Sequence, residues 1–494
     1  MVNVIHTENG RLRKTSYADV GAMVQKGVER KNIVIHVHGG LVSENSARQT
    51  AARLSPYYDS DGAGAVSIFP VWESALHETL LNNLRDVARE KFFRIVTKRV
   101  RKIAKRKARQ SSGERVSGTL PMWDGTDEEN DIDTAFETLD YAKLPADFEM
   151  PAELTELSQA EMHMFEEELK LDLELDDCVE AISNGLLSDE ELHAAANVRG
   201  GTISRASSET LMSPDAVRRY MDQPDHNTRG LFSGLKIIKA VVSIAYRVIK
   251  RCVKKRDHGV YTTIIEEILR EFYLANVGEK VWKMMKGDTK DCFGDDPHVF
   301  GGTALLSALG AHLDAGKQVR VTLVGHSAGA VYLSHLIDEA DEIFPEAFKF
   351  DVVFLAPAAT IDLVEKKIVR NAHRINDFRM FTMTDRNERK DRLVGFLYPH
   401  SLLYFISGVL EGSKDEPIVG MSRFFNGEQF DRRKFSDINK VKKFVAAKRD
   451  GLCWSTASDG RGRNTKALKH GDFDNDVTTM ESLQAIARYG FGRG

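Results

Sequence analysis

Ser327 is the residue of this chain whose surroundings best fit a chemical role. It lies at the centre of Gly-His-Ser-Ala-Gly, residues 325–329, between an apolar run over 319–324 and a helix-like run over 330–337. A glycine two residues to either side of the serine allows a sharp turn and keeps side chains away from the hydroxyl. Between a strand and a helix, this pattern is typical of a serine whose Oγ stands exposed above a sheet edge. The spacing therefore predicts that Ser327 is a nucleophile in acyl transfer.

A second feature, near the N-terminus, fits the same chemistry. Residues 33–37 are largely β-branched and predict a strand, which is followed by His38, Gly39 and Gly40. With the serine motif downstream of it, the chain resembles an α/β-hydrolase of the esterase and lipase type. The resemblance covers residues 30–75 and 258–490. It implies an oxyanion hole formed by backbone N–H groups of Ala328 and of the Gly39-Gly40 loop.

A nucleophilic serine needs a general base, because its hydroxyl is a weak nucleophile near neutral pH, and the base needs a carboxylate to orient it. The resemblance implies the chain order Ser, then Asp or Glu, then His. His470 is the predicted base, since it lies in a loop just before the last amphipathic run, 477–486. His400 is the main alternative. It opens the helix-like run 401–406, where a structural role is more typical.

Three aspartates are candidates for the acid that orients the base. Asp385 follows residues 378–383, which alternate as a strand, and the resemblance places the acid after this strand. Asp385 is therefore the first choice. Asp391 lies further along the same loop and is the alternative, and Asp362, after the strand predicted at 352–357, is the third candidate. Each of them would otherwise be a loop residue or a helix N-cap.

Strands and helices alternate around these residues. The chain begins with a hairpin signal, Asn9-Gly10, and alternation then predicts an α/β fold with a mostly parallel sheet covered on both faces by helices. The resemblance makes this the α/β-hydrolase fold. The pattern stops after residue 75 and resumes near Gly301. We therefore expect an N-terminal part of the core at 1–77, a largely helical insertion (a lid or cap) at 78–257, and a C-terminal part with the Ser327 motif at 258–494.

The predicted insertion has a marked distribution of charge. Residues 78–109 and 235–254 predict two basic amphipathic helices, and residues 124–192 are strongly acidic. Two arrangements fit. The basic helices would lie on an anionic membrane surface or over a lipid-accepting pocket, or they would pack on each other and on the core with the acidic segment against them. The acidic segment would also suit a protein partner, and part of it, over 110–150, is expected to be disordered.

Composition excludes several other classes of protein. The chain has 494 residues, of which 42% are hydrophobic, and a net charge of −4, which gives no general attraction to nucleic acid. Its four cysteines are far apart, so neither a zinc site nor a disulfide framework is expected. The first residues show no basic and apolar signal segment. A cytoplasmic location, peripheral to a membrane if the basic helices bind lipid, is the expectation.

The predicted function is that of a serine hydrolase without metal or organic cofactor. Ser327 would attack an acyl carbonyl, His470 would transfer the proton, and Asp385 or Asp391 would orient His470. A carboxylic ester, such as a lipid or other acyl ester, is the expected bond. The alternatives are a thioesterase or peptidase regulated by the insertion, and a non-catalytic binding module with the same fold.

Overall fold

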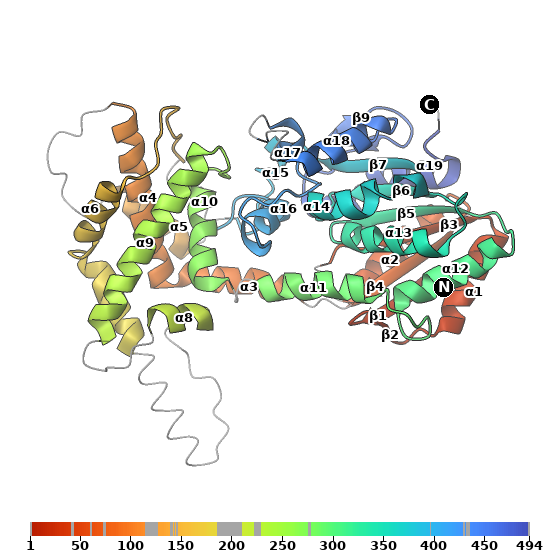
Figure 1. The fold of residues 1–494 in the computed structure, drawn as a ribbon, viewed down its shortest axis with the longest axis horizontal. Helices are drawn as coiled ribbons and strands as arrows, with labels where there is room; N and C mark the ends of the chain where they lie inside the picture. Colours follow the sequence, from red (N-terminus) through yellow and green to blue (C-terminus); the bar gives the residue numbers. More distant parts are fainter. Residues whose placement is uncertain are drawn as a thin grey trace, which may run out of the picture.

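The computed structural model describes most of the chain and shows an α/β body joined to a helical lobe (Figure 1). Two helices, α3 (Leu76–Arg89) and α11 (Glu279–Asp291), run between the two parts. The described residues are 2–40, 44–59, 62–72, 76–113, 127–138, 142, 144, 147–184, 210–221, 229–274, 278–395, 397–427, 430 and 435–492. The expectation of disorder over 110–150 concerns a stretch that lies largely outside them.

An eight-stranded sheet with the order β2-β1-β4-β3-β5-β6-β7-β8 forms the centre of the body. β1 and β2 pair antiparallel around a turn at Asn9 and Gly10, which both have positive φ, 49° and 74°. The other neighbouring strands pair parallel. The predicted hairpin and the mostly parallel α/β sheet are therefore confirmed. The strands are β1 (Asn3–Glu8), β2 (Arg11–Leu12), β3 (Asn32–Val37), β4 (Val66–Trp72), β5 (Arg320–His326), β6 (Phe350–Leu355), β7 (Ile375–Met383) and β8 (Leu452–Ser455).

Helices cover both faces of this sheet because its central strands are apolar on both sides. Val34, Val324 and Val353 belong to one cluster, with buried residues of α2 (Glu44–Tyr58) and α19 (Val477–Tyr489). The residue before each of these valines belongs to the cluster on the opposite face. Helices on that face include α1 (Tyr17–Glu29), α12 (Gly301–Asp314) and α13 (Gly329–Ile343).

Shorter elements complete the body, and several of them follow the carboxyl ends of the strands. They include α14 (Ile361–Val364), α15 (Asp385–Glu388), α16 (Leu402–Phe405), η5 (Ile406–Leu410), α17 (Ser422–Asn426), α18 (Ser436–Ala447), η6 (His470–Asp472) and a two-stranded ribbon of β9 (Ala457–Ser458) and β10 (Asn464–Thr465).

The helical lobe is organised around α9 (Arg229–Val253), which packs against α4 (Lys91–Ser111), α6 (Gln159–Leu169) and α10 (Val260–Ile268). α5 (Asp127–Thr138), α8 (Pro214–Tyr220) and η2 (Leu269–Tyr273) also belong to the lobe. Residues 173–184 are helical as well. Because α10 packs on α4 and α9, the lobe continues past residue 257, where the sequence placed its end. α9 also buries residues well beyond one narrow stripe, which is typical of a central helix.

Basic side chains of α4 are buried in ion pairs within the lobe. Arg99 is almost completely buried and donates from Nη2 to Asp172 Oδ1 at 3.1 Å. Lys98 Nζ lies 2.9 Å from Asp133 Oδ2, and Lys107 Nζ lies 2.7 Å from Glu161 Oε1. This arrangement supports packing of the basic helices against the acidic segment. In the part of the chain that the structure describes, no helix is long and apolar enough to cross a membrane.

A buried cluster of charges joins the lobe to the body. His258, which follows α9, lies with Nδ1 at 2.6 Å from Glu266 of α10 and with Nε2 at 3.0 Å from Asp415 of the body. Arg251 of α9 donates to the other oxygen of Glu266 at 2.7 Å. Burial alone would raise the pKa of Glu266, but His258 and Arg251 lower it well below its ordinary value. Opposite charges are therefore paired across the junction, as buried charges require.

Candidate functional site

Ser327 forms a strained turn between β5 and α13. Its φ is +52°, a left-handed conformation that costs energy for a residue with a side chain. The turn is held on both sides of the serine, because Ser327 N–H donates to the Leu355 carbonyl at 2.9 Å and Ala358 N–H donates to the Ser327 carbonyl at 3.0 Å. Strained backbone that the surroundings hold so firmly is common at functional sites.

The glycines around the turn leave no space for larger residues. A Cβ on Gly329 would lie 2.3 Å from the Val37 carbonyl oxygen at the end of β3, and a Cβ on Gly325 would lie 2.9 Å from the Gly329 carbonyl. The His-Gly-Gly loop also lies close to the serine, since a Cβ on Gly39 would be 3.3 Å from the Ser327 Cβ, a tight contact. Glycine is thus required here for close backbone approach.

His470 contacts Ser327 directly. Its Nε2 lies 2.9 Å from the Ser327 Oγ, the distance expected of a general base and its nucleophile. His470 begins the short helix η6, before α19. Both side chains are nearly closed to solvent, with exposed fractions of 5% for Ser327 and 6% for His470. A proton transfer between Ser327 Oγ and His470 Nε2 would therefore be shielded from solvent.

Among the candidate acids, Asp391 is the one that contacts His470. Its Oδ2 accepts the backbone N–H of His470 at 2.7 Å. Burial raises the pKa of Asp391, although that hydrogen bond counteracts the rise. Asp391, the alternative acid of the sequence analysis, therefore lies next to the predicted base.

The first choice, Asp385, has other partners. It opens α15 directly after β7, where its Oδ1 accepts from the Tyr404 hydroxyl at 2.5 Å and its Oδ2 from Arg389 Nε at 2.9 Å. Asp362 lies in an exposed pair with Lys366. Asp385 was the first choice because it lies nearest to the end of β7. In the structure, α15 begins at Asp385, and the chain reaches His470 only at Asp391.

His400 lies at the junction with the lobe. Its Nδ1 is 2.7 Å from the Pro399 carbonyl and its Nε2 is 2.7 Å from the His258 carbonyl. These contacts fit the structural role expected from the sequence.

The predicted oxyanion loop lies against the serine turn. A Cβ on Gly40 would lie 2.7 Å from the Ala328 Cβ and 1.9 Å from the Sδ of Met285, a residue of α11. The preceding residue, His38, stacks on Trp72 with ring centroids 4.4 Å apart. Burial lowers the pKa of His38 to about 4, so its ring is neutral near pH 7. The structure thus brings Gly39, Gly40 and Ala328 together.

A second histidine, His326, supports the loop that carries His470. Its Nε2 lies 3.0 Å from the His470 carbonyl oxygen, and its Nδ1 lies 3.2 Å from Asp474 Oδ2. Both partners accept hydrogen bonds, so the geometry favours a ring with a proton on each nitrogen. The His326 and His470 rings are 5.5 Å apart. This arrangement favours a charged imidazolium beside the predicted base.

The charges of this pair are mutually stabilised. Burial lowers the pKa of His326, but Asp474 more than reverses the effect, and the net pKa is raised. Burial likewise raises the pKa of Asp474, and His326 overcomes this and lowers it to about 2. Sequence reasoning missed this pair. The available signals were a histidine directly before the predicted nucleophile and an acidic loop directly after the predicted base.

Within the described ranges, no group of three or more His, Cys, Asp or Glu side chains is arranged to hold a metal ion. Comparisons with protein-family models, with curated proteins and with solved structures give no match. The function is therefore argued from the site itself.

Replacing Asp474 by asparagine should destabilise the protein in a pH-dependent way. The raised pKa of His326 contributes stability that is complete below the ordinary histidine value of 6.5 and is lost as pH rises through the folded-state pKa. The lowered pKa of Asp474 contributes stability present above 3.8 and lost as pH falls through about 2. Breaking a buried pair costs about 3 kcal/mol.

The difference in melting temperature between the parent and Asp474→Asn should therefore be largest between pH 4 and 6 and shrink towards pH 9. Glu8→Gln is the matched control, because Glu8 forms an exposed pair with Arg13. Its effect should be small throughout this range. A difference for Asp474→Asn that is constant from pH 4 to 9 would mean that His326 is not charged.

Proposed function

We propose that the chain is a serine hydrolase with an α/β-hydrolase fold, which cleaves a carboxylic ester through an acyl-enzyme. The observation that carries this proposal is the contact of 2.9 Å between Ser327 Oγ and His470 Nε2, at a left-handed turn that follows a central parallel strand. The serine thereby has a base within reach of its proton, which is the requirement for activating a hydroxyl.

The proposed reaction has two halves. Ser327 Oγ attacks the ester carbonyl carbon while His470 Nε2 accepts the hydroxyl proton. His470 then gives this proton to the leaving alkoxide oxygen, and the acyl group remains on Ser327. In the second half, a water molecule attacks the acyl-enzyme, His470 accepts a proton from it, and the proton returns to Ser327 as the carboxylic acid leaves.

The negative charge of each tetrahedral intermediate needs preorganised donors. We assign this role to the backbone N–H groups of Ala328 and of the Gly39-Gly40 loop, which the glycine packing holds against the serine turn. Each such donor contributes about 3 to 4 kcal/mol to the stabilisation of the transition state. In this proposal the left-handed turn at Ser327 and the Gly39-Gly40 loop both help to stabilise the tetrahedral intermediates.

Asp391 is the acid that we propose as the orienting group, in place of Asp385. It already holds the His470 backbone at 2.7 Å, whereas both oxygens of Asp385 are occupied by Tyr404 and Arg389. A carboxylate in this role fixes the tautomer of the base and stabilises the imidazolium that forms during attack.

The substrate class follows from the enclosure of the site and from the resemblance to esterases and lipases. A nucleophile with an exposed fraction of 5% favours an acyl group that leaves water readily, as the acyl chain of a lipid or other apolar ester does. Thioesters and peptide bonds are attacked by the same chemistry. No cofactor is required for these steps.

The lobe is proposed to regulate access to this site. α11 joins the lobe to the body, and its Met285 packs directly against Gly40 of the oxyanion loop. A displacement of α11 would change this contact. The lobe could act on the site through α11 in several ways. It could serve as a lid, as a switch controlled by a partner protein, as a docking surface, or as a part that contacts a membrane peripherally.

Hydrolysis of 4-nitrophenyl acetate by the parent protein tests the proposal. Ser327→Ala and His470→Gln should each lower kcat/KM by at least a thousandfold, because the nucleophile and its base act as one unit. Ser334→Ala is the matched control, since Ser334 is a buried serine of α13 that donates to the Ala330 carbonyl. It should keep the parent's rate. A folded parent without activity would instead favour a non-catalytic binding module.

The two candidate acids can be ranked with the same assay. Asp391→Asn should lower kcat by several orders of magnitude, because an amide no longer stabilises the correct protonation state of His470. Asp385→Asn should cost much less. Circular dichroism is used to check that both variants are folded. The opposite ranking would return the orienting role to Asp385.

A further inference from the structure

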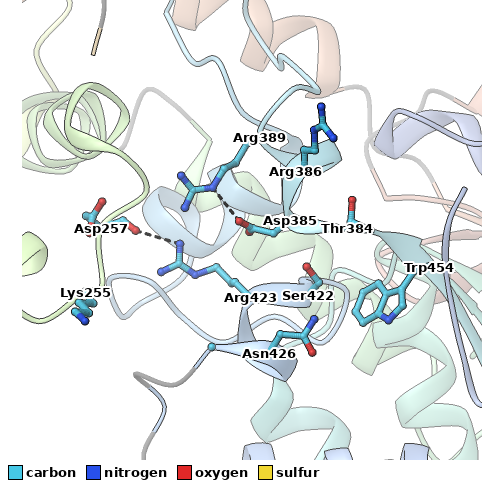
Figure 2. Close-up of a pocket in the computed structure, with 11 residues that line it drawn as sticks. Lys255, Asp257, Thr384, Asp385, Arg386, Arg389, Ser422, Arg423, Asn426 and Trp454 are labelled. Atoms are coloured by element: carbon cyan, nitrogen blue, oxygen red, sulfur yellow. Dashed lines mark hydrogen bonds and ion pairs between the residues drawn. The ribbon is translucent and has the colours of Figure 1, made fainter. Parts of the chain in front are cut away.

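A polar cavity of about 570 Å³ lies between the body and the segment that follows α9 (Figure 2). Thr384 and Asp385 at the end of β7, and Trp454 of β8, form one side of it, and Lys255 and Asp257 form the other. The remaining lining residues are Arg386, Arg389, Ser422, Arg423, Asn426 and Gly427.

Cations outnumber carboxylates in this lining. The lining contains Lys255 and three arginines, but only two carboxylates, those of Asp257 and Asp385. Both oxygens of Asp385 already accept hydrogen bonds, from Tyr404 and Arg389. Asp257 Oδ1 accepts the Gly259 N–H at 2.9 Å. The carboxylates of the cavity therefore neutralise only part of its positive charge.

Two cationic side chains remain for a ligand. The Lys255 and Arg386 side chains form no ion pair or hydrogen bond with any described residue. Arg423 is buried, with a side-chain exposed fraction of 5%, and binds the Asp257 carbonyl and Asp415 through its two terminal nitrogens. Its Nε is closed to solvent, so a ligand cannot bind this atom. Arg423 therefore contributes positive charge to the cavity wall but no hydrogen bond.

The cavity opens at the same sheet edge as the proposed catalytic serine. Ser327 follows β5, and Asp385 follows β7, the second strand from β5 in the sheet. Adjacent strands are about 4.8 Å apart, so the two strand ends are separated by about 10 Å. Ligands of open parallel sheets bind at this edge. The distance between the two strand ends is therefore one that a molecule of moderate length can span.

We propose that this cavity binds a phosphate or carboxylate group, and that this group belongs to the ester that Ser327 attacks. The second clause rests on the proposed function, whereas anion binding does not. Lys255 and Arg386 supply the positive charge and hydrogen bonds that such an anion requires, and the paired Arg389 and Arg423 add positive charge to the lining. Trp454 offers an apolar wall to the part of the ligand between anion and ester. The substrate class is thus an acyl ester with an anionic group.

Binding of inorganic phosphate tests the cavity independently of catalysis. Phosphate binding is measured by isothermal titration calorimetry on two proteins. One carries Ser327→Ala alone, and the other carries Ser327→Ala together with the cavity pair, Lys255→Gln and Arg386→Gln. The added pair of substitutions should weaken phosphate binding at least tenfold. A control pair, Lys349→Gln and Arg370→Gln, removes the same charge from exposed positions outside the cavity and should bind as before. Absence of phosphate binding, or equal loss in both pairs, would overturn the proposal.

The link to the substrate is tested with two esters. The ratio of kcat/KM for a mono-4-nitrophenyl ester of adipic acid to that for 4-nitrophenyl acetate should fall about tenfold in the cavity pair and stay constant in the control pair. An unchanged ratio beside normal phosphate binding would separate the anion site from the substrate. Phosphate binding by a chain that hydrolyses neither ester would leave the anion site standing without the proposed function.

The source of the phosphate is identified by vesicle sedimentation. Binding to phosphatidic acid vesicles, but not to phosphatidylcholine vesicles, that is lost in the cavity pair would assign a lipid headgroup. Binding of free phosphate without sedimentation would assign a small phosphorylated or carboxylated ester.

Discussion

The left-handed backbone at Ser327 is the constraint on which the rest of the site depends. At φ +52° the turn is unfavourable unless neighbouring strands hold it, and hydrogen bonds from the end of β6 and the loop after it do so. The same turn brings Gly329 so close to β3 that a Cβ would overlap the Val37 carbonyl. The order of strands, the glycines and the oxyanion loop therefore act together to hold Ser327 in a strained turn at the sheet edge, against His470.

The pairing of buried charges is the second organising feature, and it is seen at three places in the structure. The His326–Asp474 pair supports the His470 loop, the Arg99–Asp172 pair closes the lobe, and His258 is held between Glu266 and Asp415 at the junction. In each case the opposite charge is supplied within hydrogen-bond distance, as burial demands. The polar cavity beside α15 is lined by more cations than carboxylates, and this excess of positive charge is the basis for proposing an anionic ligand.

Short sequence patterns predicted those features of the structure that depend on interactions between residues close together in the chain. The apolar strands, the Asn9-Gly10 hairpin, the turn at Ser327 and the loop position of His470 follow from features within a few residues of each other, and the structure places Ser327 and His470 together. The choice between Asp385 and Asp391 depended on where a helix begins after β7 and on which side chains lie opposite it. The partners of His326 and of Arg99 lie 148 and 73 residues away. Such contacts depend on tertiary packing, which no short pattern contains.

Labelling with a fluorophosphonate probe tests the central claim, that His470 activates Ser327, most directly. Attack of Ser327 Oγ on phosphorus expels fluoride, and the proton passes to His470. Mass spectrometry should place the adduct on the peptide containing residues 325–329, and the labelling rate should fall steeply in His470→Gln while Ser334→Ala labels like the parent. A folded parent that stays unlabelled, or labelling of Ser327 at an equal rate without His470, would contradict the account.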